Sequence, residues 1–208
     1  GVASLLHPEL VEGDVVLTNS AGIHAPAMAQ TILAMILHFH RGLDHAVRAQ
    51  HAGEWSVQVF EELDSGVREV DGATLGIIGY GGIGRALAQR ARALGMHILA
   101  TRRTPHADDG PEVLHGPDAT ERLLHESDVV AICVPPTFST RGMIGAAQLA
   151  RMKQDALLIN VGRGDVVDED ALVRALRARR LRRAAPGVFA REPLPPDSPL
   201  WALPDVVH

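Results

Sequence analysis

The sequence predicts an α/β protein in which helices cover both faces of a doubly wound parallel sheet. Two observations support this prediction. After residue 72, short apolar runs of strand length alternate with segments of helical periodicity, as in successive βαβ units. These runs are apolar throughout rather than at every second residue, which is expected for strands that are covered on both faces.

Composition limits the classes of function. The chain has 208 residues, a mass of 22.2 kDa and 46% apolar residues, which is enough to bury a core. Its formal net charge of −5 argues against a nucleic-acid or anionic-lipid partner. The single cysteine, Cys133, excludes a disulfide framework and a cysteine-based zinc site, and inside an apolar run it is expected to be inert. No apolar run approaches the ~20 residues of a membrane span and no signal peptide is visible, so we expect a cytoplasmic protein.

Three segments precede the regular alternation. Residues 14–18 predict a short strand. From Pro26 to Val47, apolar residues recur at steps of three and four, which predicts one long helix with Pro26 in its first turn. Residues 53–72 are polar and irregular and predict a surface loop. Four histidines on or near the long helix do not suit a metal site and are interpreted as surface or interface side chains: His38, His40, His45 and His51.

The alternation itself predicts four strands, at residues 75–78, 98–100, 129–134 and 156–161. Helices are predicted at residues 83–94, 119–125, 146–152 and 169–179. The last of these helices has acidic residues in its first turn and arginines in its last turn, which complements the helix dipole at both ends. A weaker strand is predicted at residues 184–189, where Pro186 and Gly187 disfavour regular pairing.

A glycine motif follows the strand predicted at residues 75–78 and opens the next predicted helix. Its residues are Gly79, Tyr80, Gly81, Gly82, Ile83 and Gly84, which fit G-x-G-x-x-G. In this context the pattern indicates a Rossmann-like dinucleotide site: Gly79 would permit the tight turn, Gly81 the approach of a pyrophosphate, and Gly84 close packing of helix on strand. The free amides and the positive dipole end of the helix favour an anion. The alternative is a glycine-rich turn that only joins strand to helix.

The end of the next predicted strand bears on which dinucleotide binds. An NAD site usually has an acidic residue about 20 positions after the glycine motif, where it accepts hydrogen bonds from the ribose. Here Arg102 and Arg103 follow the strand, with no acid at the strand end. Two guanidinium groups suit a 2′-phosphate, so we predict NADP as the cofactor, with NAD possible. The alternative is that both arginines only face solvent.

Two further segments are more specific than the glycine motif: Asn160-Val161-Gly162-Arg163-Gly164 and Phe189-Ala190-Arg191-Glu192-Pro193. With them, nearly the whole chain resembles the D-isomer-specific 2-hydroxyacid dehydrogenases, the family that includes glyoxylate/hydroxypyruvate reductases and phosphoglycerate dehydrogenases. The resemblance implies a dinucleotide-binding domain over residues 25–208. It implies that residues 1–24 are a remnant of the substrate domain and its crossover. It also implies a homodimer formed by this domain.

The resemblance implies roles for single residues. Arg163 matches the family's catalytic arginine, which would hold the substrate carboxylate and polarise the 2-oxo group. Glu192 matches the carboxylate that orients the catalytic histidine and raises its pKa. Gly1 and Val2 match the end of a loop whose amides bind the substrate carboxylate. The positions that match the lining of the dinucleotide site are Gly82, Ile83, Arg102, Val134, Val161 and Arg163.

These residue types suit the reduction of a small 2-oxo acid such as glyoxylate or hydroxypyruvate. The donors of an arginine form a fixed fork that fits a carboxylate, and positive charge beside the carbonyl stabilises the developing oxyanion. We therefore predict hydride transfer between NADP(H) or NAD(H) and a 2-oxo or 2-hydroxy acid. In the structural alternatives, Arg163 forms an ion pair with Asp165 or Asp168, and Glu192 is a solvated loop acid.

Three departures from the family pattern favour a second hypothesis. By alignment, the family's catalytic histidine would fall a few residues beyond His208, so His208 is not assigned as the acid. Gly187 stands where the family usually has an aspartate that contacts the nicotinamide carboxamide. Almost all of the family's substrate domain is absent. These departures leave open a non-catalytic dinucleotide-binding or interaction module of the same fold.

Overall fold

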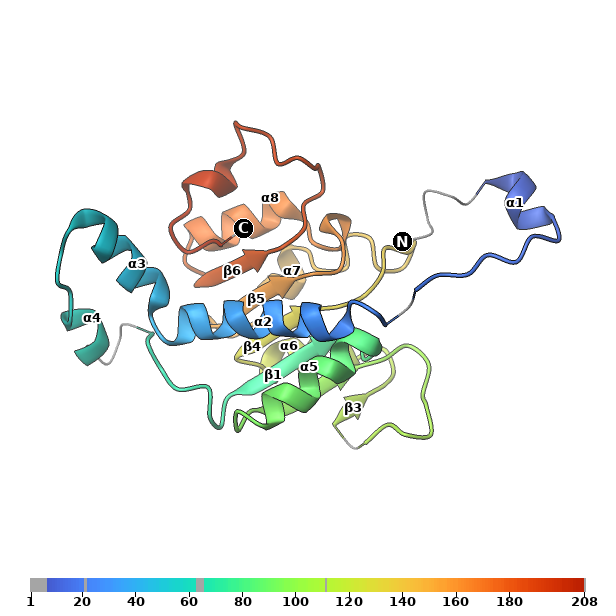
Figure 1. Cartoon of the computed structure of the whole chain (residues 1–208), viewed down its shortest axis with the longest axis horizontal. Helices are drawn as coiled ribbons and strands as arrows, with labels where there is room; N and C mark the ends of the chain where they lie inside the picture. The colour runs from blue at the N-terminus through green and yellow to red at the C-terminus, as the bar shows by residue number, and fades with distance from the viewer. Residues whose placement is uncertain (1–6, 21, 63–65, 111, 208) are drawn as a thin grey trace.

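A six-stranded parallel sheet forms the centre of the molecule (Figure 1). The structure is a computed structural model, and it describes residues 7–20, 22–62, 66–110 and 112–207. The strand order is β3-β2-β1-β4-β5-β6, and it reverses between β1 and β4. This is the order of a doubly wound dinucleotide-binding fold, so the predicted fold class is confirmed. The strands are β1 (Thr74–Ile78), β2 (His97–Thr101), β3 (Val113–Leu114), β4 (Val129–Ile132), β5 (Leu157–Asn160) and β6 (Arg183–Pro186).

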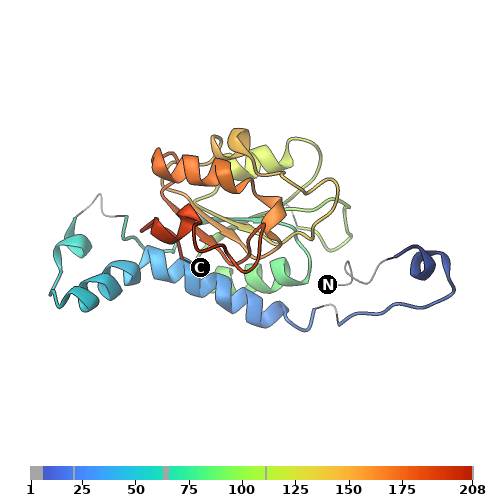
Figure 2. The same cartoon turned by 90° about the horizontal axis from the view of Figure 1, so that it is seen from above.

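Helices cover both faces of the sheet (Figure 2). On one face lie α2 (Ala25–His40) and α5 (Gly82–Arg92), and on the other lie α6 (Ala119–Glu126), α7 (Ala146–Leu149) and α8 (Glu169–Arg177). Successive strand residues alternate between the two resulting cores: Leu75 and Ile77 pack on the α2 side, and Ile78 packs on the α8 side. Because both sides are apolar, the strands carry no polar face, as the sequence pattern predicts.

The four strands and four helices predicted from the alternation occur within a few residues of their expected bounds. Several elements are shorter than predicted, among them α7 and β6. The segment 146–152 contains only the single turn of α7, and the weak strand predicted at residues 184–189 is β6, which ends at Pro186. Gly187 still donates its amide to Asn160 O at 2.9 Å, and β6 ends there. Pro186, the last residue of β6, has no amide hydrogen to donate.

Three predictions of secondary structure for the first 72 residues are wrong. Residues 14–18 form no strand, since no described strand pairs with them, and Val15 and Val16 are exposed. The long helix is two helices, because the chain leaves the helical conformation at Gly42 (φ 66) between α2 and α3 (Leu43–Ala52). The predicted loop contains a short helix, α4 (Gln58–Glu61). Sequence reasoning also missed α1 (Pro8–Glu12) and β3. Figure 1 shows α1 and the α3–α4 segment projecting from opposite ends of the body.

His40 is not the surface or interface side chain that was predicted. It is 2% exposed at the end of α2, and its Nδ1 lies 3.1 Å from Ile36 O. Its Nε2 is buried and has no hydrogen-bond partner among the residues that the structure describes. Desolvation, and then the positive charge of Arg68, lower the pKa of His40 from 6.5 to about 4, against a smaller opposite effect of the bond to Ile36. The ring is therefore a neutral part of the core at physiological pH.

Cys133 directly follows β4 and packs against the core on the α2 side. Desolvation raises the pKa of its thiol to about 12. A thiol that stays protonated is a poor nucleophile, which agrees with the inert role predicted for it. Among the described helices, none has the length and apolar character needed to cross a membrane.

Candidate functional site

The glycine motif lies at the carboxyl end of β1, beside β4, where the strand order reverses. In open α/β sheets, ligands bind outside the carboxyl ends of the strands at this position. The end of β2 is held against the motif, because Thr101 O accepts the amides of Gly79 and Tyr80 at 3.1 and 3.0 Å. The motif and the tip of β2 therefore form one continuous edge.

The backbone of the motif explains its glycines. Gly79 turns the chain with φ 102, and a Cβ there would lie 2.8 Å from Val134 Cγ1. A Cβ on Gly84 would lie 2.5 Å from Gly79 O, so helix and strand pack too closely for a side chain. A Cβ on Gly81 would meet no atom within 4 Å. The backbone at Gly81 therefore borders open space, which a pyrophosphate requires if it is to reach the amides.

The start of α5 suits an anion. Gly81 precedes the helix and offers no side chain to its first amides, which have no acceptor within the helix. The first turn also carries no acidic residue. The positive end of the helix dipole and the free amides at Gly82 and Ile83 are thus available to a phosphate group.

At the tip of β2, Arg102 is paired with an acidic residue, which the sequence did not predict, whereas Arg103 is not. Arg103 is exposed and makes no hydrogen bond or ion pair with any described residue. Arg102 is not free, because its Nη1 lies 3.0 Å from Asp109 Oδ1. An acid therefore does lie beside the strand end, although it comes from seven positions further along the chain.

Arg163 stands in the turn that follows β5, and the side chain of Asn160 shapes this turn. Asn160 is 4% exposed. Its Oδ1 accepts the Gly162 amide at 3.0 Å, and its Nδ2 donates to Arg163 O at 2.9 Å. The guanidinium of Arg163 is exposed and donates from Nη1 to Gly162 O at 2.7 Å. Asn160 thus positions Arg163 through the backbone, a role that sequence reasoning did not assign.

The ion pair considered as an alternative role for Arg163 is not formed. Asp165 instead lies 3.2 Å from Arg141 Nη2. Asp168 accepts the Ala171 amide at 2.9 Å and so caps the start of α8. The Arg163 side chain is left without an acidic partner among the described residues, as a substrate-binding arginine requires.

The segment that carries Glu192 packs directly on the Arg163 turn. A Cβ on Gly164 would lie 1.8 Å from the carbonyl carbon of Phe189 and 2.1 Å from the amide of Ala190, so the two backbones are in contact. Glu192 is exposed, and its Oε1 accepts the Phe189 amide at 3.0 Å. The structure therefore brings together the two segments on which the predicted catalytic residues lie.

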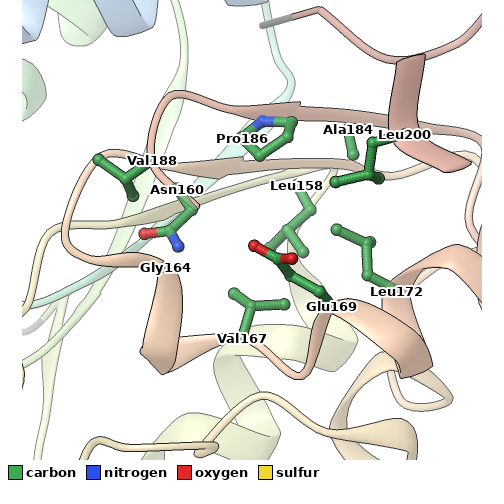
Figure 3. Close-up of a pocket in the computed structure, with 10 residues that line it drawn as sticks. All are labelled: Leu158, Asn160, Gly164, Val167, Glu169, Leu172, Ala184, Pro186, Val188 and Leu200. Carbon is green, nitrogen blue, oxygen red and sulfur yellow. The ribbon is translucent and has the colours of Figure 1, made fainter. Parts of the chain in front are cut away.

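A small apolar cavity lies between α8, β5 and β6, next to this contact (Figure 3). Glu169, the first residue of α8, is the one acidic side chain in its lining, and its Oε1 accepts the Ala190 amide at 2.6 Å. Asn160 and Gly164 line the same cavity. The start of α8 and the Arg163 turn thus line the same cavity, and the hydrogen bond from Ala190 to Glu169 connects the Glu192 segment to them.

Val134 links the glycine motif to the Arg163 turn. Its Cγ1 would meet a Cβ on Gly79, and its carbonyl oxygen would lie 2.5 Å from a Cβ on Gly162. Val161 is 7% exposed and its amide donates to Ile132 O at 3.1 Å. The glycine motif, both valines and Arg163 therefore lie along the carboxyl edge of β1, β4 and β5.

Some of the residues named from the sequence cannot be placed in this site. Gly1, Val2 and His208 fall outside the described residues. Within the part of the chain that the structure describes, no three His, Cys, Asp or Glu side chains gather as metal ligands.

A parallel sheet with this strand order, whose glycine turn leads into an uncapped helix, defines a dinucleotide-binding domain. Residues 33–208 match the family described as D-isomer specific 2-hydroxyacid dehydrogenase, NAD binding domain. The chain belongs to this family, and the predicted resemblance is confirmed.

Named relatives agree with this assignment. The chain is 41% identical over 199 residues to glyoxylate/hydroxypyruvate reductase B of Pectobacterium atrosepticum, covering 95% of this chain and 62% of the relative. It is 39% identical over 199 residues to glyoxylate reductase of Korarchaeum cryptofilum, covering 96% and 60%. A D-isomer specific 2-hydroxyacid dehydrogenase from Xanthobacter autotrophicus Py2, solved with NADPH and MES, superposes with a TM-score of 0.85 at 34% identity, covering 100% of this chain and 83% of that one. The chain thus spans under two thirds of the curated relatives it matches.

Proposed function

We propose that this chain is the cofactor-binding domain of an oxidoreductase that transfers hydride between NADP(H), or NAD(H), and a small 2-oxo or 2-hydroxy acid. The observation that carries the proposal is the placement of the Arg163 turn beside the glycine motif, with Val134 in contact with both. A carboxylate-binding arginine next to a diphosphate-binding turn is the arrangement that such a transfer needs.

The residues of the chain would share the work as follows. When bound, the nicotinamide supplies or accepts the hydride. The amides at the start of α5, including those of Gly82 and Ile83, bind the diphosphate. Arg163 binds the substrate carboxylate and stabilises negative charge on the 2-oxo oxygen. Glu192, by the family resemblance, orients a histidine acid that the described residues do not include.

NADP is the proposed cofactor, with NAD possible. Arg102 and Arg103 at the tip of β2 support NADP, since guanidinium groups suit a 2′-phosphate. The Xanthobacter structure, solved with NADPH, supports the same preference. Glyoxylate and hydroxypyruvate are the proposed substrates, because the curated relatives are named for them.

Steady-state assays test the enzyme proposal. The full-length gene product is assayed with NADPH and NADH against glyoxylate, hydroxypyruvate and other 2-oxo acids. We expect turnover with a higher kcat/KM for NADPH. The absence of cofactor oxidation with every acid, together with tight cofactor binding, would favour the non-catalytic dinucleotide-binding or interaction module. Gly187, in place of the family's aspartate, is the observation that favours this second candidate.

Restoring the missing carboxylate provides a separate prediction. Gly187→Asp is expected to tighten NADPH and NADH binding by about tenfold, because the new side chain can accept a hydrogen bond from the nicotinamide carboxamide. The site has room: Gly187 is not among the positive-φ glycines, and a Cβ there would lie 3.4 Å or more from every neighbour.

Fluorescence titration of both cofactors measures the effect of Gly187→Asp. Gly187→Ala is the matched control, since it adds the Cβ without the carboxylate. Equal affinities for the wild type, the alanine variant and the aspartate variant would remove this position from the cofactor site.

A homodimer and a cytoplasmic location complete the proposal. Exposed apolar side chains on and beside α3 and α4 support the dimer, since such side chains mark interaction surfaces; they are Leu43, Val47, Trp55, Val57 and Phe60. Sedimentation of the purified protein tests the dimer.

A further inference from the structure

Three side chains meet beyond the ends of β2 and β3, at the side of the glycine motif. Arg102 Nη1 lies 3.0 Å from Asp109 Oδ1, and His115 Nε2 lies 3.3 Å from Asp109 Oδ2. His115 Nδ1 lies 3.0 Å from the carbonyl oxygen of Arg102. The three residues therefore form a closed set of contacts, of which only Arg102 has a predicted role.

The pairing of two parallel strands brings these residues together. Thr101 is in register with Leu114, so Arg102 and His115 are the next residues of the two strands. The amide of Arg102 donates to Leu114 O at 3.3 Å, which continues the pairing. Asp109 lies in the connecting loop, where its own amide donates to His106 O at 3.0 Å and closes a tight turn.

Both oxygens of the Asp109 carboxylate are engaged by contacts within the protein. Its side chain is 8% exposed, Oδ1 accepts from Arg102, and Oδ2 accepts the His106 amide at 2.8 Å. Desolvation acts to raise the pKa of Asp109, but the hydrogen bonds from the His106 amide and Arg102, with the charges of Arg102 and His115, lower it below the ordinary value. The carboxylate is therefore ionised, and both of its oxygens are engaged within the protein rather than held open for a ribose hydroxyl, as the acid of an NAD site is.

Arg102 keeps donors that Asp109 does not use. Its side chain is 25% exposed, and among the described residues only Nη1 has a hydrogen-bond partner. A guanidinium has five donors in a rigid fork, so Nε and Nη2 remain for a phosphate. Because the contact of Nη1 with Asp109 already restrains the side chain, Arg102 loses less conformational entropy when Nε and Nη2 bind a ligand.

We propose that Asp109, itself held by the His106 amide, is a positioning residue that fixes the Arg102 guanidinium for the phosphate monoester on the nucleotide ribose and so sets the preference for NADP over NAD. This inference rests on the proposed cofactor site. In an NAD site, an acidic residue near the adenosine ribose favours NAD. Here Asp109 would favour NADP, because it acts on Arg102 and not on the ribose.

Two physical effects of Asp109 oppose each other, and their balance makes the inference testable. A carboxylate near a phosphate repels it, so removal of the charge alone would tighten NADPH binding. Removal of the contact to Arg102 frees the guanidinium and weakens NADPH binding. The direction of the change in NADPH affinity therefore distinguishes positioning from simple repulsion.

The experiment measures dissociation constants of NADPH and NADH by fluorescence titration of the full-length gene product. Asp109→Ala is expected to weaken NADPH by about tenfold and to change NADH by less than about twofold, because only NADPH carries the 2′-phosphate. Asp108→Ala is the matched control: it removes the neighbouring acid, whose side chain is 89% exposed, and should change neither constant. Tighter or unchanged NADPH binding by the Asp109 variant would overturn the inference. Equal weakening of both cofactors would do the same, since it would indicate a purely structural role.

A double-mutant cycle with Arg102→Ala tests whether Asp109 acts through Arg102. In the Arg102→Ala background, Asp109→Ala should not weaken NADPH binding, because only the repulsion by the carboxylate remains to be removed; an undiminished weakening would overturn the positioning role. Failures of the two proposals are distinguishable. If the wild type binds NADPH no more tightly than NADH, the cofactor preference and the positioning role are rejected together. If the wild type prefers NADPH and only Arg102→Ala removes the preference, the positioning role alone is rejected.

Discussion

Replacing Arg163 by lysine is expected to lower kcat by about two orders of magnitude while cofactor affinity stays within about twofold. An ammonium keeps the positive charge but cannot form two parallel hydrogen bonds to a carboxylate. The guanidinium of Arg163 is exposed and has no acidic partner among the described residues, so the substitution should leave the fold intact.

Steady-state kinetics of the full-length gene product, together with cofactor titration, measure the effect of Arg163→Lys. Arg174→Lys, at an exposed position on α8, is the control for the same change of residue type and should leave kcat as it is. Unchanged kinetics of the Arg163 variant would show that this residue lies outside the active site.

The free energy of unfolding is expected to fall as the pH is lowered from 6.5 to 4, with His40 contributing about 3 kcal/mol of the loss. The sign follows from the two pKa values. Between pH 6.5 and 4 the unfolded chain binds a proton at His40, whereas the folded chain keeps the buried ring neutral. Protons therefore favour the unfolded state in this window, and the contribution is fully present above it.

Urea unfolding at pH 7.5 and pH 5 measures the effect of His40. In His40→Asn the difference in free energy between the two pH values should shrink by about 2 kcal/mol, because asparagine does not titrate. His51→Asn, at an exposed position on α3, should keep the wild-type difference. The assignment fails if the His40 and His51 variants show the same dependence on pH.

The sequence predicts those parts of the fold that rest on local patterns. The β1–α5 unit is an example, because an apolar run, a glycine turn and an amphipathic helix are adjacent in the chain. The division between α2 and α3 is not predicted, because apolar residues keep helical spacing past Gly42. Residues 14–18 have the composition of a strand, but a strand forms only where a neighbour pairs with it.

The candidate site divides in the same way. The glycine motif and the Arg163 turn are contiguous segments, so their patterns are visible in the sequence. Asp109 and His115 reach Arg102 only through the pairing of β2 with β3, and β3 has just two residues. A strand of that length has no periodicity to detect. Only the recognition of residues 113–114 as an edge strand could have placed Asp109 and His115 beside Arg102.

The shielded thiol of Cys133 has a practical consequence. It is the only cysteine in the chain, and a pKa of about 12 keeps it protonated and unreactive toward maleimides at neutral pH. A cysteine introduced at the fully exposed Phe138, in the loop after Val134, would then be the one labelled position. A fluorophore attached there would mark the loop that follows Val134, whose side chain lies beside the glycine motif.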